Sequence, residues 1–501
     1  MVTSSTTRGR PPRGAASPPF AAQTAFRRAS RGDYFAWLDH IWPAAGCASP
    51  VRLRGTIRHI DTATGELLRD ISTTDMPDGV IYKTCGNRRA TVCSSCAETY
   101  RRDAYQVIRS GLAGGHGVPG QVAAHPAVFV TFTAPSFGPV HNRVVRNCTC
   151  ADPACCTCPA LPCHPRRDWP ACEHGQPLTC YARHRPGDPQ IGQPLCLDCY
   201  DHDGHVVWNN KVGELWRRTR QAVERYLNSL ARHRHLPPIR VSHGKAAEYQ
   251  ARGAVHFHAL FRLDGLDDAD PGHLMAPPAG ITAADLEDAV RRAAAVVNYR
   301  TSSHPVQPGG WLLTWGTEID VRAIAMHGTN PVTDSMVAGY LAKYATKGTE
   351  ITGHSSRRLD AATISVYADP EGTHVQRLIH SAWTLGQPSA WESLARWAHM
   401  LGFGGHFLTK GRRYSITFQM LREARIIYQR SQTTGPGYGP IHCQEDVDSE
   451  TTLVLNRLSY VGTGWRTSGD ALLANTAADQ ARRRRQAGHD EMASENMQAA
   501  A

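Results

Sequence analysis

The chain has 501 residues, of which 41% are hydrophobic and 20% charged, a length that allows two to four domains with sizeable cores. Its formal net charge of +11 favours an anionic partner such as nucleic acid, because phosphate contacts dominate that kind of binding. No run of about 18 apolar residues occurs, and no apolar segment follows the basic N-terminus, which argues against a membrane partner and a secretory signal. We therefore expect a cytoplasmic protein whose 15 cysteines stay reduced and bind metal rather than form disulfides.

Hydrophobic periodicity predicts the following elements in chain order. An amphipathic helix is expected over Ala97–Leu112, and a buried, β-branched strand over Ala127–Phe132. From Asn147 to Tyr200 the sequence is rich in cysteine and proline and lacks periodicity, which indicates an inserted module stapled by metal. The remaining expected elements are a helix at Trp208–Ala231, a strand at Ala254–Leu263, a helix at Ala283–Val297, strands at Leu312–Thr314 and Glu318–Val321, a helix at Asp334–Thr346, and a basic, helix-rich region from Val375 to Gln429.

A pair of histidines marks the most informative strand. In Gly253-Ala-Val-His256-Phe-His258 one residue separates the histidines, so on a strand both project from the same face. Two imidazoles placed in this way can converge on one divalent cation, and Glu248 could add a carboxylate. Such a mixed set suits Mg²⁺ or Mn²⁺ bound to a phosphate oxygen. The alternatives are that the histidines are ordinary core or surface residues and that Glu248 is a solvated side chain.

Two tyrosines form a second pair. In Gly339-Tyr340-Leu-Ala-Lys343-Tyr344-Ala-Thr-Lys347, Tyr340 and Tyr344 lie one helical turn apart on one face. Lys343 and Lys347 repeat that spacing on a neighbouring line. A tyrosine nucleophile must lose its proton, and a nearby lysine can stabilise the phenolate or a phosphate, so all four residues are candidates for catalysis. The alternative is an amphipathic helix with tyrosines at the edge of the core and lysines in water.

The order of these motifs resembles that of HUH endonucleases. The apolar strand Phe129-Val-Thr-Phe-Thr133 comes first, then His256-Phe-His258, then the tyrosine pair. The pair of tyrosines resembles that of the two-tyrosine initiators of rolling-circle replication. Further stretches between roughly residues 80 and 425 resemble replication initiators of actinomycete plasmids, namely Cys85-Gly-Asn-Arg-Arg-Ala-Thr-Val-Cys-Ser-Ser-Cys96, Thr133-Ala-Pro-Ser-Phe-Gly-Pro-Val140, Tyr249-Gln-Ala-Arg-Gly253 and Trp397-Ala-His-Met-Leu-Gly-Phe403.

This resemblance implies an α+β fold in which helices flank a central antiparallel sheet, with the histidine pair on a middle strand and the tyrosine helix packed over it. It also implies metal-dependent, site- and strand-specific nicking and rejoining of DNA. A tyrosine would attack the scissile phosphate, leaving a 5′-phosphotyrosine link and a free 3′-hydroxyl. The implied partner is origin DNA, single-stranded or in a hairpin. A host helicase is also expected, because the chain has no Gly-x4-Gly-Lys-Ser/Thr phosphate loop.

The motifs and the shifts in composition also predict a division of the chain into domains. We expect a disordered arm at 1–32, an N-terminal region with the Cys85 motif at 33–124, the first nuclease strand at 125–146, a cysteine-rich zinc-binding insertion at 147–205, the nuclease core with the histidine and tyrosine pairs at 206–350, a basic, helical C-terminal region at 351–467 and a disordered tail at 468–501.

The cysteines recur at spacings typical of structural zinc sites. A Cys-x2-Cys pair brings two thiolates to one metal, and four ligands close such a site. The best single set consists of Cys172, Cys180, Cys196 and Cys199. A second set, Cys85, Cys93 and Cys96, needs a fourth ligand, and the cysteines that could supply it or form another site are Cys148, Cys150, Cys155, Cys156, Cys158 and Cys163. For Cys47 and Cys443 the alternative is an unpaired, buried thiol.

Basic stretches indicate where DNA could bind. Lys410-Gly-Arg412-Arg413-Tyr414 interleaves cations with an aromatic ring, which suits contact with a DNA backbone and a base, although a solvated edge strand is an equal alternative. Arg482–Arg485 fits a nonspecific electrostatic tail. Origin recognition could also involve the arginines in the cysteine-rich module, which are Arg166, Arg167, Arg183 and Arg185.

Two other functions stay open from the sequence. A two-tyrosine HUH transposase has the same motifs and acts on different DNA. A non-enzymatic zinc-ribbon DNA-binding regulator accounts for the cysteines and the charge, but it leaves the histidine and tyrosine pairs as coincidence. A conjugative relaxase fits less well, because relaxases place the tyrosine before the histidine motif, the reverse of the order here.

Overall fold

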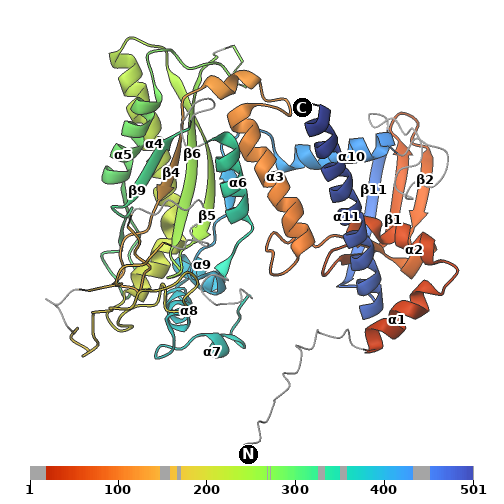
Figure 1. Ribbon diagram of the computed structural model, residues 1–501, viewed down its shortest axis with the longest axis horizontal. Helices are drawn as coiled ribbons and strands as arrows, with labels where there is room; N and C mark the ends of the chain where they lie inside the picture. Colours follow the sequence, from red (N-terminus) through yellow and green to blue (C-terminus); the bar gives the residue numbers. More distant parts are fainter. Residues whose placement is uncertain are drawn as a thin grey trace, which may run out of the picture. The chain divides into compact units, whose positions relative to one another are not determined.

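The computed structural model of the chain describes residues 19–146, 158–165, 171–267, 269–270, 272–324, 333–349, 358–432 and 452–499. The chain divides into two compact units, unit 1 (residues 1–100 and 422–501) and unit 2 (residues 101–421). The unit boundaries fall within helices α3 (Ser94–Ala113) and α10 (Phe418–Gln432). Both units combine helices with antiparallel sheets (Figure 1), which confirms the predicted α+β class. Within the described ranges, no helix has the length and apolar character needed to cross a membrane.

Unit 1 is built on a sheet whose strands come from both ends of the chain. β1 (Val51–Asp61) pairs with β11 (Thr452–Thr463) along its whole length, and also with β2 (Leu67–Ser72) and β3 (Ile81–Lys83). Its other helices are α1 (Pro19–Ala29), α2 (Tyr34–Ile41) and α11 (Ser468–Ala499). The small core of this unit contains Trp37, Ile41, Val80, Tyr82 and Ala474.

Both ends of the chain differ from the predicted disorder of residues 1–32 and 468–501. The described parts of these segments contain α1 and α11, which pack against each other. Arg28 of α1 donates hydrogen bonds to Asp470 of α11 (2.9 Å) and to Asp78 (2.8 Å), and all three side chains are buried. The alanine-rich sequence of α11 favours a helix, and its partner lies more than 400 residues away, so no local pattern predicts the contact. Residues 1–18 and 500–501 lie outside the described ranges.

Unit 2 contains a five-stranded antiparallel sheet in the order β10-β5-β6-β4-β9. Its strands are β4 (Ala127–Phe132), β5 (Ile239–Tyr249), β6 (Val255–Gly265), β9 (Ile319–Ala323) and β10 (Leu408–Lys410), and a separate pair is formed by β7 (Asn298–Arg300) and β8 (Leu312–Thr314). The remaining helices of the unit are α4 (His202–His233), α5 (Ala283–Val296), α6 (Asp334–Ala345), α7 (Ile364–Tyr367), α8 (His374–Leu385) and α9 (Glu392–Arg396).

Both faces of the five-stranded sheet are covered. Alternate side chains such as Val130 and Phe257 face α4 and α5 in the large core of the unit. On the opposite face, Leu260 packs with Leu341 of α6 and Ile108 of α3. Figure 1 shows α4 and α5 on one side of the strands and α6 on the other. Helix α6, which carries the tyrosine pair, is therefore held against β5 and β6, which carry the predicted metal ligands.

Several predicted elements of unit 2 are confirmed, whereas the division into domains differs. β4 and β8 coincide with the predicted strands, and α5 and α6 each end one residue before the predicted end. However, residues 351–421 belong to the same unit as the predicted nuclease core, and β10 pairs with β5. The predicted C-terminal region also contains β11, which joins unit 1. Strand pairing across long sequence separations has no local signature, so composition alone did not predict it.

Candidate active site and metal-binding groups

The β5–β6 hairpin brings Glu248, His256 and His258 together, and we call these three residues the hairpin triad. The register places Glu248 directly opposite His256, so the two side chains share a face of the sheet with His258. The Nε2 atoms of His256 and His258 lie 3.0 and 3.1 Å from the same oxygen, Glu248 Oε2. One ligand atom from each residue lies within 4.8 Å of the other two. The structure thus places all three predicted metal ligands in one cluster.

The charge state of the hairpin triad suits a divalent cation. Burial raises the pKa of Glu248, but hydrogen bonds from both histidines and the nearby positive charge of Lys347 outweigh it and lower that pKa to about 2. Burial lowers the pKa of His258 to about 4. At neutral pH the carboxylate is therefore ionised and the His258 imidazole neutral, which are the forms that bind metal. His258 Nδ1 lies 3.1 Å from Thr131 Oγ1 on β4. If the imidazole proton moves from Nε2 to Nδ1 and is donated to that hydroxyl, Nε2 no longer donates to Glu248 and becomes available to bind a metal.

Helix α6 places both tyrosines beside the hairpin triad. Thr333 caps the helix through its side chain, and Val337, Leu341 and neighbouring alanines are buried against the sheet. The ring of His258 lies 4.9 Å from the ring of Tyr340 and 5.3 Å from that of Tyr344. The two tyrosine rings are 4.5 Å apart. The predicted spacing of one helical turn therefore brings both hydroxyl-bearing rings to one site.

The two candidate lysines differ in their contacts. Lys347 Nζ lies 3.1 Å from Glu248 Oε1 and 4.2 Å from the centre of the Tyr344 ring. Lys343 lies on α6 with an exposed side chain. Burial raises the pKa of Tyr340, which makes a neighbouring cation more important for forming a phenolate.

Two residues of β4, Phe129 and Thr131, also line this site, although no individual role was predicted for them. Thr131 contacts His258 as described, and the ring of Phe129 stacks on His258 at 6.0 Å with an interplanar angle of 8°. Strand pairing opposes Thr131 to His258. Thr131 is the one polar position in the otherwise apolar sequence of β4, which could have marked it in the sequence. The residue that it faces depends on the strand register, which only the folded sheet defines.

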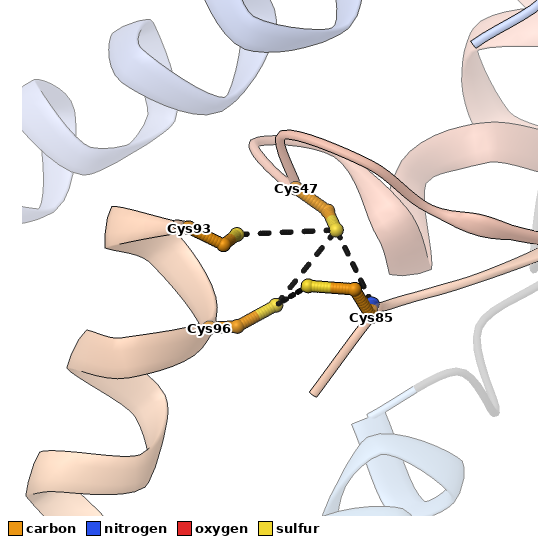
Figure 2. A group of neighbouring side chains, drawn as sticks. All are labelled: Cys47, Cys85, Cys93 and Cys96. Atoms are coloured by element: carbon orange, nitrogen blue, oxygen red, sulfur yellow. Dashed lines mark hydrogen bonds between the residues drawn. The ribbon is translucent and has the colours of Figure 1, made fainter. Parts of the chain in front are cut away.

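Four cysteines of unit 1 converge on one point, and we call them the Cys47 group (Cys47, Cys85, Cys93 and Cys96). Figure 2 shows the sulfur atoms of three separate segments pointing toward one another, namely the loop of Cys47, the segment after β3 that carries Cys85, and the start of α3. The Sγ–Sγ distances are 3.6 Å between Cys85 and Cys96 and 3.8 Å between Cys96 and Cys47. The fourth member of the predicted Cys85 set is therefore Cys47, which lies 38 residues upstream of Cys85. Cys47 was not among the cysteines predicted to complete the set.

The geometry of the Cys47 group fits a zinc ion. Four ligands about 2.3 Å from zinc at the corners of a tetrahedron lie about 3.8 Å apart, close to the distances found here. The backbone N–H of Cys85 also donates to Cys47 Sγ at 3.2 Å, and that of Ala48 to Cys93 Sγ at 3.3 Å. Such donors stabilise thiolates, and no disulfide joins the cysteines in the described part of the chain. This group could hold a metal such as zinc.

Two further groups lie in unit 2, and all their members except His141 belong to the cysteine-rich module. The Cys163 group consists of His141, Cys163, Cys180 and His184, and the Cys172 group of Cys172, His174, Cys196 and Cys199. The predicted set of Cys172, Cys180, Cys196 and Cys199 is thus divided, because Cys180 lies in the Cys163 group and His174 takes its place. The prediction used only the spacing between cysteines, so it left out the histidines of both groups. Cys148, Cys150, Cys155, Cys156 and Cys443 lie outside the described residues.

Comparison with known proteins identifies the family. The family model described as "Replication initiator protein, pSAM2" matches residues 33–479. The chain belongs to this replication initiator family. A curated protein of Streptomyces ambofaciens named "Replication initiator protein" is 40% identical over 462 residues, which cover 90% of this chain and 91% of that protein. No solved structure matches the chain.

The basic residues predicted to bind DNA have two different surroundings in this member of the initiator family. Lys410 Nζ donates to the backbone oxygen of Ser415 at 2.8 Å, so its ammonium group holds the turn after β10. Arg412 and Arg413 are exposed and line a cavity of about 300 Å³ with Arg220 and Arg240.

The arginines of the cysteine-rich module are only partly described. Arg183 donates to the backbone oxygen of Ala160 at 2.7 Å, and Arg185 is exposed. Arg166 and Arg167 lie outside the described residues.

Proposed function

We propose that this initiator starts rolling-circle plasmid replication by nicking one strand of origin DNA through a tyrosine, as a two-tyrosine HUH endonuclease. The observation that carries the proposal is the position of His258. Its Nε2 lies 3.1 Å from the Glu248 carboxylate, while its ring contacts both Tyr340 and Tyr344. A cluster able to bind a cation therefore lies directly beside two potential nucleophiles, on elements that the chain order separates by about 80 residues. The family favours replication initiation over transposition or gene regulation.

The hairpin triad would hold Mg²⁺ or Mn²⁺. Its two imidazole nitrogens and one ionised carboxylate leave open positions for phosphate oxygens, which suits these cations. A cation bound there supplies positive charge that polarises the scissile phosphate. Thr131 keeps the His258 ring in the orientation that ligation needs.

The tyrosines would supply the nucleophile. As the phenolic oxygen bonds to phosphorus, its proton leaves, the bond from phosphorus to the 3′ oxygen breaks, and that oxygen takes up a proton. The products are a 5′-phosphotyrosine link and a free 3′-hydroxyl that can prime synthesis. Lys347 Nζ lies 4.2 Å from the centre of the Tyr344 ring, so its charge favours the Tyr344 phenolate. We assign the first attack to Tyr344 and the second to Tyr340.

DNA would be held through its phosphates. The net charge of +11 suits origin DNA, single-stranded or in a hairpin. Arg412 and Arg413, which follow β10, offer exposed guanidinium groups in the same unit as the hairpin triad. A host helicase is the further partner that we propose, because the sequence contains no phosphate-binding loop of its own for unwinding. The Cys47 group would hold a structural Zn²⁺.

The proposal is tested by trapping the covalent intermediate. Purified protein is incubated with Mn²⁺ and end-labelled single-stranded DNA from the region flanking its own gene, and the products are separated on a denaturing gel. We expect label at the mass of the protein, which is lost with EDTA and in the double variant Tyr340→Phe/Tyr344→Phe. Tyr344→Phe alone should reduce the adduct more than Tyr340→Phe. Tight DNA binding without any adduct would overturn the nuclease assignment.

A further inference from the structure

The Cys163 group has the geometry of a closed metal site. Its two thiols and two imidazoles each offer one ligand atom, and these four atoms lie within 4.8 Å of one another. Cys163 Sγ is 4.0 Å from His141 Nδ1, and Cys180 Sγ is 3.7 Å from His184 Nε2. A set of two thiolates and two imidazoles is a ligand set that tetrahedral Zn²⁺ prefers in structural sites.

A carboxylate outside the group supports a metal at this position. His184 offers Nε2 to the group, and its other ring nitrogen, Nδ1, lies 2.8 Å from Asp188 Oδ2. The His184 side chain is fully buried. Metal-bound histidines almost always donate their second ring N–H to a carboxylate or carbonyl, which fixes the tautomer. Asp188 therefore has the position of a partner that orients His184 for ligation.

The same residues are tied to a short loop, Asp188–Gln193. The backbone N–H of Gly192 donates to the oxygen of His141 at 2.7 Å, and the N–H of His141 donates to the oxygen of Gln193 at 2.8 Å. Asp188 accepts the N–H of Gln190 at 2.9 Å on the carboxylate oxygen that does not face His184. Two members of the Cys163 group, His141 directly and His184 through Asp188, thus hold this loop.

The loop in turn packs against the hairpin of the active site. Gly192 has a φ of +86°, and a Cβ added to it would come within 2.4–2.7 Å of the peptide that joins Ala251 to Arg252. The backbones are therefore in such close contact that only glycine fits. Ala251 and Arg252 lie in the turn between β5 and β6, closed by the hydrogen bonds Gly253 N–H to Gln250 O and Gln250 N–H to Ala254 O. Glu248 and His256 lie on either side of this turn.

We propose that the Cys163 group binds Zn²⁺ and that this zinc holds the loop Asp188–Gln193 against the β5–β6 turn, so that Glu248 and His256 stay in register. His141, Cys163, Cys180 and His184 are the ligands, and Asp188 and Gly192 are positioning residues. The zinc assignment stands on its own, whereas the importance of the register for catalysis rests on the proposed nicking function. The cysteine-rich module is thereby a brace for the active-site hairpin rather than only an attachment to it.

The first experiment measures zinc and backbone exchange in the full-length protein without DNA. Zinc per chain is determined by elemental mass spectrometry after dialysis, and hydrogen exchange is followed for the peptide that contains the Gln250 and Gly253 amides. Cys163→Ser should lose one zinc equivalent relative to the unmodified chain. Exchange in the turn should become at least about tenfold faster, because the loop no longer supports it. An unchanged zinc content would overturn the metal site, and lost zinc with unchanged exchange would overturn the brace.

A second variant keeps all four ligands in case Cys163→Ser does not fold. Asp188→Asn should release zinc to a competing chelator about tenfold more readily and raise exchange in the turn by a smaller factor. The matched control is Glu371→Gln, which removes the same charge from a side chain that is 88% exposed and should change neither quantity. Equal zinc affinity in Asp188→Asn and the control would overturn the role of Asp188. Since these measurements need no DNA, they remain valid even if the unmodified protein forms no tyrosine adduct, an outcome that removes only the proposed function.

Discussion

The hairpin triad and the Cys47 group are both clusters of metal-ligating side chains, yet the chain assembles them in opposite ways. The triad lies on two strands joined by a short turn and is covered by helices with a large apolar core beneath the sheet. The Cys47 group gathers three segments around a small core, with Cys93 and Cys96 as its only pair close in sequence. The first cluster therefore has extensive apolar packing beneath it, whereas a bound metal would be the main anchor of the second. This difference predicts opposite responses to loss of a ligand.

The largest effect is expected from Cys47→Ser. Removing one of four ligands should abolish zinc binding to this group, and unit 1 should lose its cooperative thermal transition because the three segments no longer have a common anchor. Calorimetry and metal analysis measure both. Cys158→Ser, which changes a cysteine outside the three groups, serves as the control and should leave the transition of unit 1 in place. A zinc-free Cys47→Ser protein with an unchanged transition would show that packing holds unit 1 as it holds unit 2.

The corresponding change in the hairpin triad should affect chemistry rather than folding. His258→Ala removes one proposed metal ligand and the ring that contacts both tyrosines, so formation of the tyrosine–DNA adduct should fall on the order of 1000-fold. The melting temperature should shift far less than in Cys47→Ser, because the surrounding core remains. His406→Ala, at an exposed position, is the matched control. A His258→Ala protein that unfolds, or that reacts at the normal rate, would contradict this contrast.

The buried carboxylate of Asp264 is expected to contribute to the stability of unit 2 through its hydrogen bonds and its ion pair with Arg262. Its carboxylate is fully buried and accepts hydrogen bonds from Arg262 (2.8 and 2.9 Å), His125 (2.8 Å) and Ser242 (2.5 Å). Asp264→Asn leaves the buried Arg262 guanidinium without its charged partner and should cost about 3 kcal/mol in the free energy of unfolding, measured by urea titration. Asp270→Asn, at an exposed position, should cost far less.

The pH dependence follows from the same carboxylate. Burial raises the pKa of Asp264, but the hydrogen bonds and the Arg262 charge outweigh it and lower the pKa to about 2, against about 4 in the unfolded chain. A depressed pKa contributes stability that is complete above about pH 4 and is lost as the pH falls toward about 2. The unmodified protein should therefore lose stability over that window, and Asp264→Asn should lose less. Equal slopes in the two proteins would contradict the assignment.

The smallest effect is expected at the exposed arginines. Arg412→Ala/Arg413→Ala should weaken binding of single-stranded DNA about tenfold. The salt dependence of binding should also fall, because a complex with fewer phosphate contacts releases fewer counterions when it forms. The control is Arg291→Ala/Arg292→Ala, which removes the same charge from α5, where each arginine pairs with an acidic residue one turn away. Equal losses in the two variants, measured by fluorescence anisotropy at several salt concentrations, would indicate a general effect of charge.

Much of the candidate active site could be predicted because its information is local. A His-x-His pattern puts two side chains on one face of any strand, and Tyr340 and Tyr344 share one face of any helix. The same locality explains why both ends of β4, β8, α5 and α6 were predicted to within one residue. The sequence did not distinguish the roles of Lys343 and Lys347, because the two lysines repeat the spacing of the tyrosines. The contact between Lys347 and Glu248 depends on the packing of α6 on β5.

The sequence by itself determined the mixed fold class, the spacing of the catalytic candidates and the abundance of metal ligands. The tertiary structure decided which ligands belong together: Cys47 with Cys85, Cys93 and Cys96, and Cys180 with two histidines rather than with Cys172. It also decided that both chain ends form one unit through β1 and β11. Periodicity and short motifs report contacts within a helix or strand, whereas these groupings depend on chain paths that bring distant segments together, and no short-range pattern encodes such paths.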